Sequence, residues 1–231
     1  MFNITYKNMT PEDFGAWLAT IPVLTHATIN RTRFSVPMRD GELLINDVSR
    51  NNAHWQCMVH LRKNDYMARI RNIRGWLSGE GALKISNGSN PDSFFEVLQV
   101  THTEDIMKSS DYGRLTVDFE VYPYEFLLSG ESEITNYQSI TNPAEMSKPE
   151  YVIEGTGNGT LTVNGNDMDF DVETKLTIDT RRQIAKNNQN QDANDKINGD
   201  YEGLLLKSGA NTISISNGFT LKVIPHWGYK I

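Results

Sequence analysis

The stretch Leu115-Thr116-Val117-Asp118-Phe119-Glu120-Val121 decides the fold, because its apolar and polar side chains alternate along its whole length. Successive side chains of a β-strand point to opposite faces of a sheet, so this stretch predicts a half-buried strand. Two further strands are predicted before it, at Leu83–Ile85 and Phe95–Val100, and clusters of Asn, Gly, Ser and Pro separate them. From Gly81 onward the sequence therefore predicts β-structure.

Upstream of Gly81 the sequence predicts two short helices. Thr10 as an N-cap, Pro11 at the first helical position and Asp13 three residues after the cap are typical of a helix start. This first helix is expected to end before Pro22, and its apolar face is formed by Phe14, Trp17 and Leu18. A second helix is predicted over about 65–78, with an apolar stripe of Tyr66, Ile70, Ile73 and Leu77.

A hairpin arm is predicted at about 28–45. Phe34, Val36 and Met38 alternate with polar neighbours, and the Asp40-Gly41 pair before Leu43 is a hairpin signal. The next run, Trp55–Leu61, alternates in the same way and predicts another half-buried strand. The fold class is therefore mainly β with two short helices.

The chain divides into two predicted domains, an N-terminal β domain at 1–130 and a C-terminal β-sandwich at 151–231. Residues 131–150 are polar and contain Pro143 and Pro149, which indicates a junction. The strands predicted for the sandwich are Tyr151–Glu154, Thr160–Val163, Met168–Ile178, Gly203–Leu206, Thr212–Ile215 and Phe219–Ile224. Within this half, Lys186–Asp200 is predicted to be an exposed polar loop that contributes no core residue.

Composition excludes several classes of function. The chain has 231 residues and a formal net charge of −7, without a dominant basic patch, so binding of nucleic acid through its phosphates is not expected. The longest apolar runs, such as Leu204–Leu206, are too short to enter a membrane. A single cysteine, Cys57, excludes an internal disulfide and indicates synthesis in a reducing compartment.

No set of residues predicts catalysis, a metal or a cofactor. Cys57 has histidines only at odd spacings, so His54 and His60 are expected on the opposite face of their strand. Asp167, Asp169 and Asp171 could form a calcium ladder or a pair of glycosidase carboxylates, but a solvated strand face is the better interpretation. The chain is therefore not expected to be an enzyme.

Basic side chains gather on the second predicted helix, where Arg71 lies opposite the apolar stripe. Solvent exposure is the default interpretation of such a cluster, and salt bridges between subunits are the alternative. Together with the hairpin arm, this cluster supplies the candidate subunit-interface residues, which are Phe34, Val36, Met38, Arg39, Arg69, Arg71 and Arg74.

The order of motifs resembles the distal tail protein (Dit) family of long, non-contractile phage tails. In the first half the resemblance rests on Val36-Pro37-Met38-Arg39-Asp40-Gly41-Glu42-Leu43, Gly75-Trp76-Leu77, Asn90-Pro91-Asp92-Ser93-Phe94-Phe95 and the run from Gly113 to Pro123. In the second half it rests on Ile153–Gly159, Leu161–Gly165 and Gly209–Ile213. Met38 departs from the pattern, because the family usually has glycine at that position.

The resemblance implies a structural protein of the virion. It implies a homohexameric ring that joins the tail tube protein to the central hub or fibre protein, with the N-terminal domain forming the ring. The C-terminal domain is expected to be a galectin-like sandwich that can dock receptor-binding proteins. The protein is then expected in the tail tip or baseplate of the virion, after synthesis in the cytoplasm of the bacterial host.

The alternative is a carbohydrate-binding tail module that grips glycans of the host surface. In that case exposed aromatic side chains stack on the sugars, and the candidates are Tyr137, Trp227 and Tyr229. A tail-associated hydrolase is a third alternative, but no motif in the sequence supports it.

Overall fold

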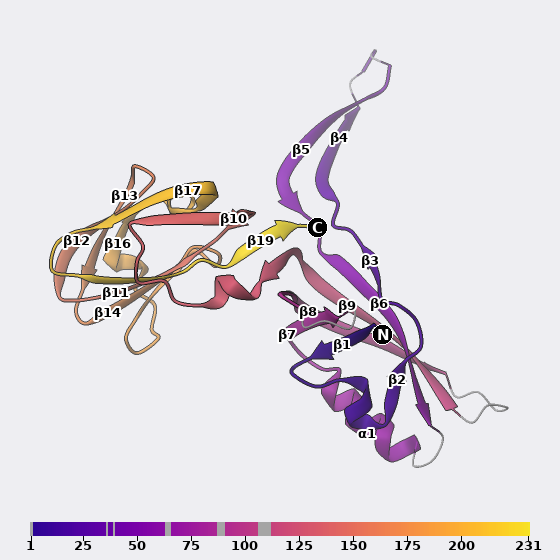
Figure 1. The fold of residues 1–231 in the computed structure, drawn as a ribbon. Helices are drawn as coiled ribbons and strands as arrows, with labels where there is room; N and C mark the ends of the chain where they lie inside the picture. Colours follow the sequence, from indigo (N-terminus) through magenta and orange to yellow (C-terminus); the bar gives the residue numbers. More distant parts are fainter. Residues whose placement is uncertain (1, 36, 39, 63–65, 87–90, 106–111) are drawn as a thin grey trace. The chain divides into compact units, whose positions relative to one another are not determined.

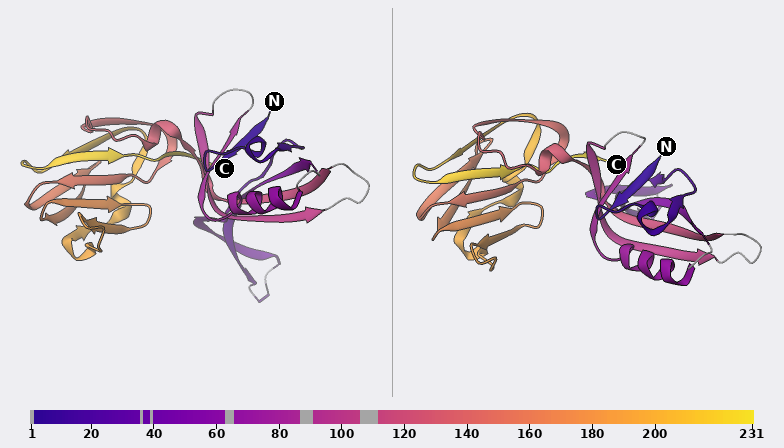
Figure 2. Two further views of the ribbon diagram at one scale, coloured as in Figure 1. Left: turned by 90° about the horizontal axis from the view of Figure 1, so that it is seen from below. Right: turned by 60° about the horizontal axis from the view of Figure 1, so that its bottom comes forward.

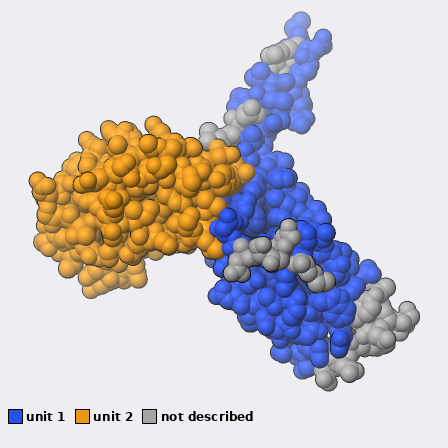
Figure 3. Space-filling model, in the orientation of Figure 1, with its two compact units in different colours: residues 1–125, 231 blue, residues 126–230 orange. Residues whose placement is uncertain are grey.

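The computed structural model describes residues 2–35, 37–38, 40–62, 66–86, 91–105 and 112–231. The chain forms two compact units, and the mainly β architecture is confirmed. Unit 1 comprises residues 1–125 together with Ile231, and unit 2 comprises residues 126–230 (Figure 3). The chain therefore passes from unit 1 to unit 2 after Glu125 and returns to unit 1 at its last residue.

Unit 1 is built on a sheet whose two long central strands pair in antiparallel register (Figure 1). The strands in order are β1 (Asn3–Tyr6), β7 (Gly81–Ser86), β8 (Ser93–Asp105), β9 (Tyr112–Leu127) and β6 (Ala53–Arg62). Two short strands, β2 (Ala16–Leu18) and β3 (Val23–Thr25), both pair with β6. The alternation at Leu115–Val121 is confirmed, because Leu115, Val117, Phe119 and Val121 are buried.

Helix α1 (Tyr66–Trp76) covers one face of this sheet, as Figure 2 shows. Its stripe of Ile70, Ile73 and Trp76 is buried in the same core as Leu83 and Val117, so the predicted second helix is confirmed. The indole Nε1 of Trp76 donates a hydrogen bond of 2.8 Å to the carbonyl oxygen of Tyr6. This bond ties the end of the helix to the first strand.

The first predicted helix is wrong in its length. It is a single 3₁₀ turn, η1 (Pro11–Phe14), which ends at Gly15 with φ of 66°. The start matches the prediction, because Thr10 N donates to Asp13 Oδ2 at 2.7 Å. Trp17 and Leu18, however, belong to strand β2. Their backbone groups form hydrogen bonds with β6 instead of with a further turn of helix.

A two-stranded arm formed by β4 (Ile29–Ser35) and β5 (Glu42–Arg50) projects from unit 1 (Figure 1). Among the described strands, β4 and β5 pair only with each other. The predicted alternation through Met38 is wrong, because β4 ends at Ser35 and Met38 has a left-handed φ of 62°. Val36 and Arg39 lie outside the described residues.

Unit 2 is a sandwich of two sheets around its own core. One sheet has the order β10 (Ser139–Ser147), β17 (Leu206–Ile215), β12 (Gly157–Val163), β13 (Asn166–Val172) and β16 (Ile197–Gly199), and β19 (Trp227–Lys230) pairs with the other edge of β10. The facing sheet has the order β15 (Ile184–Asn187), β14 (Lys175–Asp179), β11 (Glu150–Glu154) and β18 (Thr220–Ile224). Buried side chains from both sheets, including Tyr151, Leu161 and Ile178, fill the space between them.

Several boundaries in unit 2 differ from the sequence prediction. Strand β10 lies inside 131–150, where the sequence predicts a junction, and η2 (Leu128–Glu131) precedes it. Its polar residues Asn142 and Ser147 are nevertheless buried, because their side chains form hydrogen bonds with the backbone. The predicted strand Gly203–Leu206 is only partly right, because Gly203 and Leu204 belong to a 3₁₀ turn, η4 (Tyr201–Leu204), and Leu206 begins β17. Asp200 caps the turn by accepting from Glu202 N at 3.0 Å.

The Lys186–Asp200 segment is not a plain exposed loop. It contains η3 (Asn194–Lys196) and all of β16, and Ala193 is buried in the core of unit 2. Asn194 holds the segment in place, because its Oδ1 accepts hydrogen bonds from Ala185 N at 2.7 Å and from the Tyr201 hydroxyl at 2.8 Å. The prediction that this segment contributes no core residue is therefore wrong.

Asn211 on β17 is a test of how buried polar groups stabilise unit 2. Its side chain is 1% exposed and donates to the carbonyls of Lys207 at 2.8 Å and Gly209 at 2.9 Å. Its Oδ1 accepts from Lys207 N at 2.9 Å and from Asn164 Nδ2 at 2.8 Å. We expect Asn211→Ala to lower the free energy of unfolding of unit 2 by about 3 kcal/mol, because these groups lose their partners.

Chemical denaturation with a probe in unit 2 measures this difference. Asn188→Ala is the matched control, since Asn188 is exposed and makes one long hydrogen bond of 3.4 Å to Thr174. The free energy of unfolding of the control should stay within about 0.5 kcal/mol of that of the parent protein. Equal stability of the two variants would contradict the role given to Asn211.

Candidate functional site

The arm exposes more large apolar side chains than any other described part of the molecule. Along the strands these are Ile29, Phe34, Leu43, Leu44 and Ile45, with exposed fractions of 38%, 46%, 39%, 50% and 48%. Phe34 lies directly opposite Leu43 in the ladder, so the two form a cross-strand pair. A two-stranded hairpin has no second layer that could bury both of its faces, so these side chains are available to a partner.

The loop at the end of the arm displays Met38, whose side chain is fully exposed at 107% of its reference area. Its φ of 62° belongs to the left-handed region, where the Cβ of a non-glycine residue is crowded. The arm therefore carries an unstrained apolar ladder and a strained apolar tip. Polar contacts add little to the stability of the arm. Its ion pair, Arg33–Glu42 at 3.3 Å, joins side chains that are 70% and 52% exposed.

Two of the three predicted interface arginines on α1 are already engaged within unit 1. Arg69 Nη1 donates to the carbonyl of Gly15 at 3.1 Å, next to the end of η1. Arg74 forms a two-point ion pair with Glu104 on β8, with distances of 2.6 Å and 2.7 Å. The guanidinium lowers the pKa of Glu104 by hydrogen bonding to its carboxylate. Arg71 is exposed, and the structure does not bring the three arginines to the arm.

The aromatic residues proposed for glycan stacking do not form an exposed platform. Trp227 is 5% exposed and belongs to the core of unit 2, so its ring is not available to a sugar. Tyr137 is partly buried against the same core, and Tyr229 is 37% exposed with its hydroxyl donating to the Pro143 carbonyl at 3.1 Å. Alternation of apolar and polar side chains along a strand does not reveal which of its two faces is covered. Here Trp227 lies on the covered face.

The surroundings of Cys57 disfavour its thiolate form. The thiol is buried, and burial, together with the charge of Asp118, raises its pKa to about 12. His54 and His60 lie on the opposite face of β6, where His54 contacts Asp118 at 3.2 Å and His60 packs edge-on against Trp17. Among the described residues, no group of three or more His, Cys, Asp or Glu side chains could hold a metal ion.

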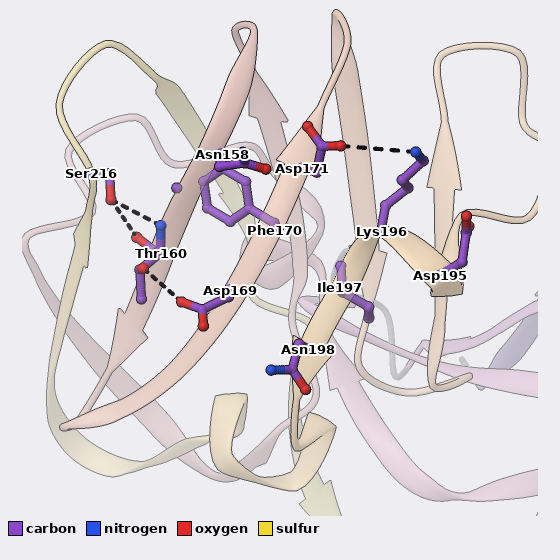
Figure 4. A pocket seen from close by; sticks show the side chains of 11 residues that line it. Asn158, Thr160, Asp169, Phe170, Asp171, Asp195, Lys196, Ile197, Asn198 and Ser216 are labelled. Carbon is purple, nitrogen blue, oxygen red and sulfur yellow. Dashed lines mark hydrogen bonds and ion pairs between the residues drawn. The ribbon is translucent and has the colours of Figure 1, made fainter.

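The alternating aspartates of β13 lie on the outer face of unit 2, as predicted for a solvated strand face. Asp167 Oδ1 accepts from the Thr162 hydroxyl at 2.6 Å, and Asp169 Oδ1 accepts from the Thr160 hydroxyl at 2.7 Å. Asp169 and Asp171 also line a hollow of about 620 Å³ between β12, β13 and β16 (Figure 4). Sequence reasoning missed this hollow, because β16 comes from a segment whose polar composition indicates a loop.

No helix in the described part of the chain is long and apolar enough to span a membrane. No protein-family model matches the sequence, and no curated protein sequence matches it. Among solved structures, the chain is similar to the crystal structure of SPP1 Dit, described as a paradigm of the hub adsorption apparatus in phages infecting Gram-positive bacteria. The TM-score is 0.70 at 13% sequence identity, and the match covers 100% of this chain and 99% of that one. The two proteins therefore share a fold over both units.

Removing the side chain of Arg74 tests the ion pair on α1. We expect Arg74→Ala to raise the pKa of Glu104 toward its ordinary value, because the hydrogen-bonding cation is lost. A lowered carboxyl pKa stabilises the fold above the unfolded-state pKa, and this contribution disappears as the pH falls through the folded-state pKa. NMR titration of the Glu104 carboxyl measures the shift. Arg71→Ala is the control, and an equal change in that variant would contradict the assignment.

Replacing Met38 tests the strain at the tip of the arm. We expect Met38→Gly to relieve about 1 kcal/mol of backbone strain and so slow hydrogen exchange at Ser35 and Glu42, which pair beside the loop, by about fivefold. Met38→Ala is the control, because it shortens the side chain but keeps the Cβ in the same conformation. If the amides of Ser35 and Glu42 exchange at the same rate in the two variants, backbone strain at position 38 does not control hydrogen exchange beside the loop.

Proposed function

We propose that this protein is a structural component of a phage tail tip, where it forms a hexameric ring between the tail tube protein and the central hub or fibre protein. The observation that carries the proposal is the fold shared with SPP1 Dit over the full length of both chains. A fold supports many functions in general, so the proposal also needs a surface suited to assembly. The exposed apolar arm of unit 1 is such a surface.

The arm suits a contact between unlike surfaces of neighbouring copies. A projecting element that binds a different surface of the next copy generates a ring when the rotation closes. Burial of apolar area stabilises such a contact by about 25 cal/mol for each Å², and the arm leaves five large strand side chains uncovered. Ring closure also covers the free edges of β4 and β5, which otherwise favour aggregation.

In this proposal unit 1 forms the ring, and unit 2 docks peripheral proteins, including a receptor-binding protein. The protein acts in the virion after synthesis in the cytoplasm of a bacterial host, and it has no catalytic activity of its own. Glycan gripping by Tyr137, Trp227 and Tyr229 is not favoured, because Trp227 is buried. An acidic chain, with a net charge of −7, suits a channel through which DNA passes without binding.

The oligomeric state tests this proposal. We expect native mass spectrometry and light scattering over a concentration series to give six times the chain mass of 26.2 kDa. The double variant Phe34→Thr/Leu43→Thr should lose the hexamer, because it removes apolar area from a cross-strand pair while keeping residues that favour strands.

Met67→Thr is the matched control, since Met67 is 57% exposed on α1 rather than on the arm. Circular dichroism checks that all variants are folded. A parent protein that stays monomeric at every concentration argues against the ring. A hexamer that survives in the double variant argues against the arm as its contact.

A further inference from the structure

One face of the arm carries apolar side chains and no charge. In the ladder Phe34 lies opposite Leu43, and Thr32 lies opposite Ile45. Residues that are directly opposite each other, or two apart on one strand, share a face of a hairpin. These four residues therefore form one face, which we call the apolar face of the arm, and all four are exposed.

The opposite face of the arm is charged. Arg33 lies opposite Leu44, and Arg31 and Glu42 occupy neighbouring positions on the same face. Arg33 and Glu42 form the exposed ion pair described above. Burial of these charges against an uncharged surface would cost free energy, because their hydration would be lost without replacement. An apolar partner can therefore cover the apolar face of the arm but not the charged one.

Unit 1 also carries an uncharged groove of about 320 Å³ outside the arm. Its lining consists of Phe2, Leu18, Ala19, Thr20 and Ile21. Ile21 is 60% exposed, and Val23, two residues further along the chain, is 63% exposed. The groove is thus a second apolar surface that the fold leaves uncovered.

The groove is held in place by the central sheet. Its segment 19–21 lies in the connection between β2 and β3, and both of these strands pair with β6. Within the connection, Ala19 N donates to the carbonyl of Met58 at 2.7 Å. Met58 N in turn donates to Thr20 Oγ1 at 3.1 Å. These bonds fix the backbone against β6, so the exposure of Ile21 is a property of the folded unit.

The arm of the same chain does not cover this groove. Figure 1 shows the arm projecting away from β2, and Phe34 and Ile21 stay 46% and 60% exposed. Each copy therefore presents one apolar arm face and one apolar groove, both uncovered. Because arms and grooves are equal in number, a head-to-tail arrangement of copies covers all of them.

We propose that the groove receives the apolar face of the arm of a second copy. In this contact Phe34, Leu43 and Ile45 pack against the groove and Val23, and the charged face of the arm stays in water. Neither surface carries a charge that the other would leave unpaired, which favours this occupant over a partner with charged side chains. The inference rests on the proposed ring and deepens it, since it names the two surfaces of one contact.

Variants of the groove test the proposal in the full-length protein. Ile21→Thr/Val23→Thr should raise the dissociation constant of the contact by about tenfold or more, because apolar groups are lost from it. Light scattering and native mass spectrometry should then show loss of the assembly. Met67→Thr/Leu98→Thr is the matched control, since these exposed side chains of unit 1 lie outside the groove. Circular dichroism checks the folding of both variants.

Mixing two defective chains isolates a single contact. Phe34→Thr/Leu43→Thr damages the arm and keeps the groove, whereas Ile21→Thr/Val23→Thr keeps the arm. Each should be monomeric alone. An equimolar mixture should form dimers of twice the chain mass of 26.2 kDa and nothing larger, because only one intact contact is available to each pair.

Cysteine cross-linking identifies the face of the arm. A chain with Ile21→Cys and Leu43→Cys should form covalent oligomers with a short bis-maleimide, and Leu43→Cys alone should not. The control combines Ile21→Cys with Leu44→Cys, because Leu44 is equally exposed but lies on the charged face. The native Cys57 is buried, so it does not compete for the reagent.

The outcomes separate this inference from the ring proposal. A hexamer that survives in the groove variant refutes the groove as the acceptor and leaves the ring standing. Equal cross-linking through Leu43→Cys and Leu44→Cys refutes the assigned face, and a mixture that stays monomeric while the parent assembles refutes the pairing. Conversely, dimers in the mixture support the contact even where the parent forms no closed ring.

Discussion

The antiparallel pairing of β6 with β9 is the interaction on which unit 1 depends. It runs from Ala53 opposite Val121 to Arg62 opposite Tyr112 and sets which face of each strand is buried. Val59, Leu61, Leu115 and Val117 then share one side of the sheet, where α1 packs. A shift by one residue would exchange this apolar side for the side that carries His54, Asp118 and Arg114. Strands β2 and β3 both pair with β6, so their places follow from the same register.

Much of this architecture is readable in the sequence, because the decisive segments are long and strictly periodic. The alternation at Leu115–Val121 and the helical stripe from Tyr66 to Ile73 each have one physical solution, and the structure adopts it. Short segments are different. Ala16–Leu18 has the composition of a helix but pairs with β6, and β10 is polar because Asn142 and Ser147 bond to the backbone while buried. Contacts with distant parts of the chain decide the secondary structure of such segments, and local composition does not reveal those contacts.

The candidate sites show the same limit. The apolar character of Phe34 is visible in the sequence, but its exposure follows from the absence of a second layer over the arm. Conversely, Trp227 is a natural candidate for an exposed aromatic residue until its burial is known. The hollow on unit 2 could not be predicted at all, since it requires Asp169 and Asn198, which are far apart in sequence, to be opposite each other on β13 and β16. Exposure and juxtaposition, rather than residue type, define both surfaces.

The return of the chain to unit 1 has a consequence for how unit 2 unfolds. Ile231 is 8% exposed within the core of unit 1, and its N–H donates to the Pro123 carbonyl at 3.4 Å. While this anchor holds, an unfolded unit 2 is a closed loop with both ends fixed, so it gains less conformational entropy than a free chain. One buried isoleucine contributes about 1.5–3 kcal/mol, which limits the strength of this restraint. The burial of Ile231 in the core of unit 1 therefore reduces the conformational entropy that unit 2 gains when it unfolds.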